Sequence, residues 1–171
     1  MRARGDGDRV LILLTAALLL AACRVEPVQR PQRIDPREVA RESISDVLDA
    51  YRDALLRSDA DAVAATFTAD AELYMPDTPD LVGVAAIRDA MNSLFAEYAP
   101  TDVLVEREQV DVGDGVAHEM GRYDQSVRTA DSMMLEMRGR YAIRWRRGPE
   151  AAWRIERMLI NHYPPDTAAT R

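Results

Sequence analysis

Hydrophobic residues in the first half of the chain recur every three or four positions, which is the spacing of one face of an α-helix. A helix of about twenty residues is predicted from residue 35, with Asp35 as N-cap, Pro36 in the first turn and Glu38 completing the cap. Its apolar stripe consists of Ile44, Val47, Leu48, Tyr51 and Leu55. A second, short helix is expected after Ser58 or Asp59, because either side chain can serve as its cap.

A third helix is predicted over residues 84–98, and Pro100 ends its helical pattern. Its apolar residues are Ile87, Met91, Leu94, Phe95 and Tyr98. Before it, residues 71–75 read as a short strand, and two prolines and Gly83 then indicate a loop.

The second half of the chain changes to a period of two, which is typical of strands with one buried face. The clearest case is residues 132–146, in which Met133, Leu135, Met137, Gly139, Tyr141, Ile143 and Trp145 form the apolar side. Further strands are predicted over residues 102–112, 116–128 and 151–163, with turns at "GDG" and "RGPE". Helices followed by a meander of strands indicate the α+β class, with three N-terminal helices packed on one face of a mostly antiparallel sheet.

Arginines interleave with aromatic residues in the stretch "YAIRWRRGPEAAWRI", which raises the question of nucleic-acid binding. The alternation places Trp145 and Trp153 on the apolar face and Arg144 and Arg154 on the opposite face. Rings and cations therefore do not form one stacking surface. The chain also has 29 acidic against 22 basic residues, a formal charge of -7, which disfavours contact with a phosphate backbone. No nucleic-acid partner is expected.

The N-terminus has the composition of a secretory signal. Basic residues precede an apolar run over residues 10–22, which is too short to span a bilayer comfortably. Cys23 follows and is the only cysteine, so it cannot form an internal disulfide. Residues 1–22 are therefore expected to be a signal peptide, with an uncleaved anchor as the alternative.

The stretch "LAAC", which ends at Cys23, resembles the lipobox of bacterial lipoproteins. This resemblance implies that Cys23 is lipidated and anchors the exported protein to a membrane. Arg24 stands where an inner-membrane retention signal has aspartate, so an outer-membrane anchor facing the periplasm is expected. Residues 23–34 read as a tether, residues 35–163 as one domain and residues 164–171 as a disordered tail.

The order of elements over residues 35–163 resembles the cone-shaped α+β fold of the nuclear transport factor 2-like superfamily, which includes SnoaL-like cyclases and ketosteroid isomerase. The segments that carry the resemblance are "YRDALLRSDADAVAATFTADAELYMP", "GVAAIRDAM", "EMGRYD", "GRYAIRW" and "WRIERMLIN". The resemblance implies that the helices and a curved sheet close around a largely apolar pocket. It implies no single function, because the fold hosts enzymes, binding modules and assembly domains. Relatives often carry an acidic residue where this chain has Met158.

Polar and aromatic residues that point into such a pocket are the candidates for function. The ligand-binding candidates are Tyr51, Tyr74, Tyr123, Tyr141, Trp153, Arg157 and Asn161; the tyrosines are alternatively core residues with satisfied hydroxyls. Glu119 shares strand parity with Tyr123 and is the catalytic candidate, because a buried carboxylate can move a proton on a substrate. Alternatively, Glu119 pairs with Arg157 and only stabilises the sheet.

Three functions remain open. The favoured one is an exported, lipid-anchored domain that binds a small, largely apolar molecule without catalysis. The second is an acid–base enzyme of isomerase, cyclase or hydrolase type, which requires a desolvated Glu119 with no arginine partner. The third is a dimeric interaction module that pairs through the outer sheet face, expected to carry Arg138, Arg140, Arg144, Arg154, Met158 and Ile160. The two histidines, His118 and His162, have no partners at metal-ligand spacing, so neither a metal nor another cofactor is expected.

Overall fold

The computed structural model describes residues 35–163, so the predictions for residues 1–34, Cys23 included, and for residues 164–171 lie outside it. Within the described residues three helices come first: α2 (Pro36–Leu56), α3 (Ala60–Ala65) and α4 (Val84–Glu97). Asp35 caps α2 by accepting from the Arg37 amide, and Asp59, rather than Ser58, caps α3 by accepting from the Ala62 amide. None of the described helices is long and apolar enough to cross a membrane.

The six strands form one sheet in the order β2-β1-β6-β5-β4-β3. Their bounds are β1 (Phe67–Tyr74), β2 (Leu81–Val82), β3 (Tyr98–Val112), β4 (Val116–Thr129), β5 (Met134–Arg147) and β6 (Trp153–His162). All neighbours are antiparallel except β1 and β6, which run parallel. The predicted class, α+β with helices before a mostly antiparallel sheet, is confirmed.

Three boundaries differ from the sequence-based prediction. The first strand begins at Phe67, four residues earlier than predicted (71 − 67 = 4), and the two-residue strand β2 lies in the predicted loop. Strand β3 follows α4 directly, so Pro100 lies inside a strand instead of beyond a helix end. Proline is tolerated there because β3 is an edge strand, and the pairing with β4 shifts its register next to it.

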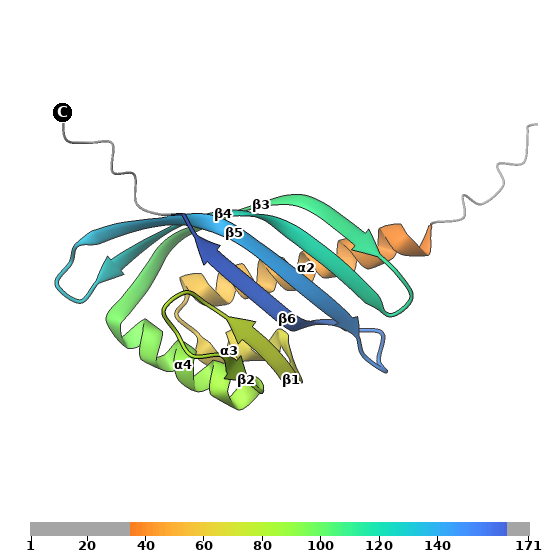
Figure 1. The fold of residues 1–171 in the computed structure, drawn as a ribbon, viewed down its shortest axis with the longest axis horizontal. Coiled ribbons are helices and arrows are strands. Elements are labelled where there is room, and N and C mark those ends of the chain that lie inside the picture. The colour runs from red at the N-terminus through yellow and green to blue at the C-terminus, as the bar shows by residue number, and fades with distance from the viewer. Residues whose placement is uncertain (1–34, 164–171) are drawn as a thin grey trace, which may run out of the picture. The chain divides into compact units, whose positions relative to one another are not determined.

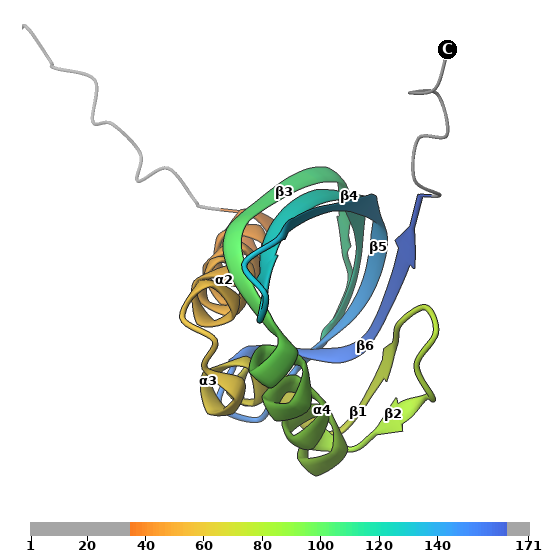
Figure 2. The same cartoon turned by 90° about the vertical axis from the view of Figure 1, so that its left-hand side faces the viewer.

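The long strands curve strongly, and the helices cover the concave side of the sheet (Figures 1 and 2). Register shifts interrupt the ladder at two places in β3 and at one place between β5 and β6. Each shift is a bulge, and bulges bend and twist a strand locally. The curvature leaves an interior that only the helices and large side chains can close.

The bulge in β6 changes which residues face inward. Arg144 pairs with Arg157 and Trp145 pairs with Ile155, so Glu156 has no partner on β5. Inward residues before the bulge are Trp153 and Ile155, whereas after it they are Met158, Ile160 and His162. The prediction that Arg157 and Asn161 point inward with Trp153 is therefore wrong, as is the placement of Met158 and Ile160 on the outer face.

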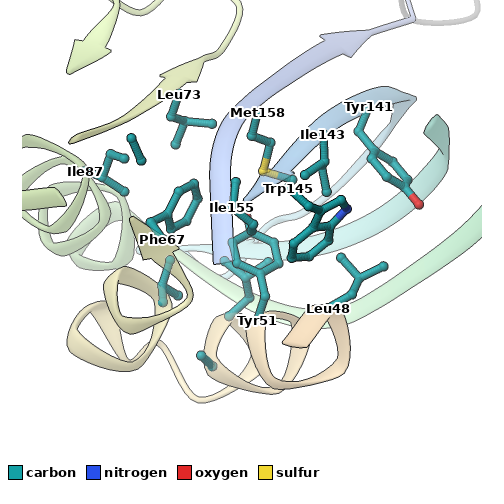
Figure 3. Close-up of a cluster of buried hydrophobic side chains, with 14 of the residues drawn as sticks. Leu48, Tyr51, Phe67, Leu73, Ile87, Tyr141, Ile143, Trp145, Ile155 and Met158 are labelled. Atoms are coloured by element: carbon teal, nitrogen blue, oxygen red, sulfur yellow. The ribbon is translucent and has the colours of Figure 1, made fainter. Parts of the chain in front are cut away.

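The apolar core lies between α2 and the strands, as the alternating pattern predicted. Trp145 and Ile155 are fully buried and Trp153 is 4% exposed. Side chains from β5 and β6 extend toward Leu48 and Tyr51 of α2, and the Tyr51 and Phe67 rings meet edge to face (Figure 3). Arg138, Arg140, Arg144 and Arg146 of β5 alternate with these inward residues and lie on the opposite, convex face.

Candidate functional site

A cavity of about 550 Å³ lies between the concave face of the sheet and helices α2 and α4. Helix α2, the β1–β2 loop and α4 contribute Leu48, Tyr51, Leu55, Met75, Pro76, Asp77, Thr78, Met91, Leu94 and Glu97. Strands β3 to β6 contribute Tyr98, Pro100, Val103, Val105, Tyr123, Gln125, Val127, Leu135, Met137, Tyr141, Met158, Ile160 and His162. The lining is mostly apolar, with a few polar groups, which is the usual composition of a small-molecule site.

Two glycines on adjacent strands provide part of this space. Gly121 pairs with Tyr141, and Gly139 pairs with Tyr123. A Cβ on Gly121 would lie 2.8 Å from the Tyr141 hydroxyl, and one on Gly139 would lie 2.9 Å from Cε1 of Tyr123. Each Cβ would also clash with a backbone carbonyl oxygen. The Cβ on Gly121 would lie 2.2 Å from the Glu106 oxygen, and the Cβ on Gly139 would lie 1.9 Å from the Asn161 oxygen. Glycine therefore lets each tyrosine ring lie across the neighbouring strand.

Three of the seven predicted ligand-binding residues, Tyr51, Tyr123 and Tyr141, line the cavity; their role in binding stays a prediction. The other four do not line it. Tyr74 donates to Glu72 Oε2 at 2.6 Å, and Trp153 lines a separate surface hollow beside α2 and α3.

Arg157 and Asn161 point to the outer face because of the bulge in β6. Arg157 binds Glu72 Oε2 at 2.6 Å rather than Glu119, so the predicted Glu119–Arg157 pair is wrong. This contact and the Tyr74 hydroxyl hold the pKa of the Glu72 carboxyl below its usual value.

Glu119 is buried, and three donors occupy its carboxylate. Arg107 Nε lies 3.1 Å from Oε1, the Tyr141 hydroxyl lies 2.9 Å from the same oxygen, and Trp145 Nε1 lies 3.1 Å from Oε2. Glu119 is absent from the cavity lining. It is desolvated, as the acid–base hypothesis requires, but it has the arginine partner that the hypothesis excludes. The geometry fits a structural anchor that fixes the Tyr141 ring.

The sequence analysis did not identify His162 as a cavity residue. Its Nδ1 is hydrogen-bonded to the Tyr123 hydroxyl, and the two rings meet edge to face with centroids 6.0 Å apart. His162 is the last residue of β6, and strict alternation from Trp153 places it on the outer face. Only the bulge at Glu156 brings it to the cavity, and no residue type in the sequence marks that bulge.

Three of the tyrosines in the lining, Tyr51, Tyr123 and Tyr141, have a pKa above the ordinary value and keep their protons at neutral pH. Burial raises the pKa of Tyr123 to about 12 and raises the pKa of Tyr51 further. The pKa of Tyr141 is raised by burial and by the adjacent Glu119 carboxylate. Within residues 35–163, no group of three or more histidines and carboxylates is arranged to hold a metal ion.

A curved sheet that closes with three helices around an apolar cavity defines a class of cone-shaped α+β domains. The family model described as "SnoaL-like domain" matches residues 38–159. The chain belongs to this SnoaL-like family, as its sequence resemblance implied. A search of curated proteins found no match.

Solved structures show the same fold. A ketosteroid isomerase-like protein from Erwinia carotovora atroseptica is 22% identical and superposes with a TM-score of 0.68, covering 77% of this chain and 100% of its own. A nuclear transport factor 2-like superfamily protein from Salmonella enterica serovar Typhimurium is 12% identical, with a TM-score of 0.66 over 79% of this chain and 99% of its own. A conserved protein from Planctomyces limnophilus is 15% identical, with a TM-score of 0.67 over 74% and 100%. At these identities the similarity establishes the fold alone.

Proposed function

We propose that the domain binds a small, largely apolar molecule in the cavity between the sheet and helices α2 and α4. The observation that carries the proposal is the cavity itself, about 550 Å³ in volume and lined mainly by aliphatic, methionine and tyrosine side chains. Burial of an apolar ligand against such walls supplies the binding free energy, and the few polar groups orient it. Gly121 and Gly139 support the proposal because each leaves room for a tyrosine ring beside the cavity.

A cavity-filling substitution tests the proposal. Met137→Trp replaces a thioether in the lining with a bulkier indole ring, whereas Met120→Trp places the same ring on the outer face, where Met120 is 45% exposed. Titration with Nile red, an uncharged fluorophore, should show affinity at least about tenfold weaker for Met137→Trp. Met120→Trp should match the wild type. Equal affinities for all three proteins, each with native circular dichroism, would contradict binding in the cavity.

The acid–base alternative has a different signature. If Glu119 transferred a proton to or from a bound substrate, Glu119→Gln would abolish turnover while ligand binding persisted. The three donors around its carboxylate favour a structural role instead, so the substitution should affect stability and affinity. Binding without catalysis is therefore the function that the geometry supports best.

We also propose that the domain is exported and held at a membrane, in the outer membrane facing the periplasm, through lipid on Cys23. The support is the sequence pattern alone, a short apolar run followed by the sole cysteine, and Cys23 lies outside the described residues. Cys23→Ser should move the protein from the membrane fraction to the soluble fraction and abolish labelling by radioactive palmitate. Membrane retention by the unlabelled variant would refute the lipid anchor.

A further inference from the structure

The charges around the cavity are unevenly distributed. Across the described residues, no arginine contributes to the cavity lining, although the convex face of the same sheet carries many. Arg107 instead forms an ion pair with the buried Glu119 carboxylate. The carboxylates in the lining, Asp77 and Glu97, are exposed and therefore belong to its rim.

This distribution opposes the binding of an anion. An anionic group that enters the cavity loses its hydration, and transfer of an unpaired charge into an apolar environment is costly. A guanidinium in the wall would offset that cost, and the described lining has none. The Asp77 and Glu97 carboxylates would repel an approaching anion as well. A neutral ligand meets none of these penalties.

The Tyr123–His162 pair is the polar feature best suited to orient a neutral ligand. Tyr123 is 9% exposed and keeps its proton, because burial raises its pKa to about 12. If the phenol donates to Nδ1 of His162, the imidazole proton sits on Nε2 and remains free to donate. If Nδ1 donates instead, the phenolic proton is free and Nε2 accepts. In both arrangements of a neutral imidazole, one donor and one acceptor remain available for a ligand.

The surroundings of this pair limit what its partner can be. Met137 and Ile160 line the same cavity with apolar surface, and Gly139 leaves room for the Tyr123 ring, since a Cβ there would lie 2.9 Å from its Cε1. Gln125 lies two residues along β4 from Tyr123 and adds an amide to the lining. A ligand oxygen here would meet phenol, imidazole and amide groups at the end of an apolar cavity, where His162 is exposed.

We propose that the ligand is an uncharged, largely apolar alcohol or ketone whose oxygen hydrogen-bonds to the Tyr123–His162 pair. This inference rests on the proposed function and adds to it the chemical class of the ligand and its polar anchor. Tyr123 and His162 come from β4 and β6, so the anchor forms only when the bulge at Glu156 turns His162 inward.

Three naphthalenes with one substituent at the same ring position test the inference: acetylnaphthalene, ethylnaphthalene and naphthoate. They have similar shapes and differ in one group, which is a ketone, a hydrocarbon or an anion. Each is titrated into the full chain at neutral pH, and binding is followed by its fluorescence. The same titrations are made with Tyr123→Phe and His162→Phe, which keep a ring at each position. Tyr163→Phe is the matched control, because it also removes one phenolic hydroxyl, and Tyr163 is 46% exposed and absent from the cavity lining.

The wild type should bind the ketone about threefold to tenfold more tightly than the hydrocarbon, which is the worth of one net hydrogen bond. Naphthoate should bind more than about tenfold more weakly than the ketone. Tyr123→Phe and His162→Phe should lose the preference for the ketone and keep the affinity for the hydrocarbon, which also shows that they fold. Tyr163→Phe should keep both the preference for the ketone and the affinity for the hydrocarbon.

Two results would overturn the inference. If the hydrocarbon binds as tightly as the ketone in every protein, the cavity binds apolar molecules but the Tyr123–His162 pair is not the anchor. If naphthoate binds best, the assigned ligand class is wrong. If none of the three compounds nor Nile red binds to the wild type, the proposed function fails together with the inference.

Discussion

Glu119 shows how a single residue was located correctly by strand parity and yet given the wrong partner. Its parity with Tyr123 on β4 predicted that it faces inward, and it is 2% exposed. Its ion-pair partner, Arg107, comes from β3, where two register shifts decide which residues reach the interior. Sequence alone provides no register across those shifts, so the contact could not be predicted.

Removal of the Glu119 charge should destabilise the fold. In Glu119→Gln the amide accepts from fewer donors and leaves the Arg107 guanidinium without its counter-charge, so we expect a loss of about 3 kcal/mol or more in the free energy of unfolding. Urea unfolding followed by tryptophan fluorescence measures this loss. Glu150→Gln, in the exposed β5–β6 turn, is the matched control. A Glu119→Gln variant within about 0.5 kcal/mol of the wild type would contradict the anchoring role.

At the scale of elements, periodicity predicted the helices and the four long strands, and the β6 bulge caused the main errors. Period-two alternation describes β4 and β5 along their whole length. In β6 the alternation holds up to Ile155 and reverses after Glu156. The reversed half contains Arg157 and Asn161, which were predicted to bind ligand, and His162, which was not. Both kinds of error have this one physical cause, because one unpaired residue moves every later side chain to the other face.

Deletion of Glu156 should therefore leave the inward face of β6 intact. Without the extra residue, Arg157 follows Ile155 directly, so regular alternation keeps Arg157 and Leu159 on the outer face and Met158 in the core. Near-ultraviolet circular dichroism should remain native, and Nile red binding should persist.

The substitution Glu156→Ala is the control for that deletion. It keeps the residue count and removes only the ion pairs with Arg144 and Arg146, so it should cost about 1 kcal/mol or less. Loss of native dichroism and of Nile red binding in the deletion variant, with both retained in Glu156→Ala, would contradict the explanation of the β6 inward face.

At the scale of the whole molecule, the convex face of the sheet is the surface through which the predicted homodimer would form. Met120, Ala142 and Leu159 form an apolar row across β4, β5 and β6, with Met120 45% and Leu159 49% exposed. Arginines flank the row on both sides, and several are paired with acids, such as Arg122 with Glu108 at 2.6 Å. This row replaces Met158 and Ile160, which the sequence analysis had placed on the outer face.

The homodimer stays a prediction. If the convex faces pair, the mass of the full chain in solution should be twice that of the monomer. Leu159→Arg should then reduce it to the monomer mass, because a charge in the apolar row disfavours burial there. Nile red binding should be unchanged, since Leu159 does not line the cavity. A wild-type protein that is monomeric by light scattering would exclude the interaction module.

The claim on which the account depends is that the interior of this domain holds a small molecule. Native mass spectrometry of the anchor-free full chain, Cys23→Ser, tests it directly on protein as it is purified. We expect a bound mass at one ligand per chain, released on unfolding and absent when Met137→Trp is added. A protein that carries no small molecule and takes up none of the uncharged probes, or one that retains the same ligand after Met137→Trp, would contradict the account.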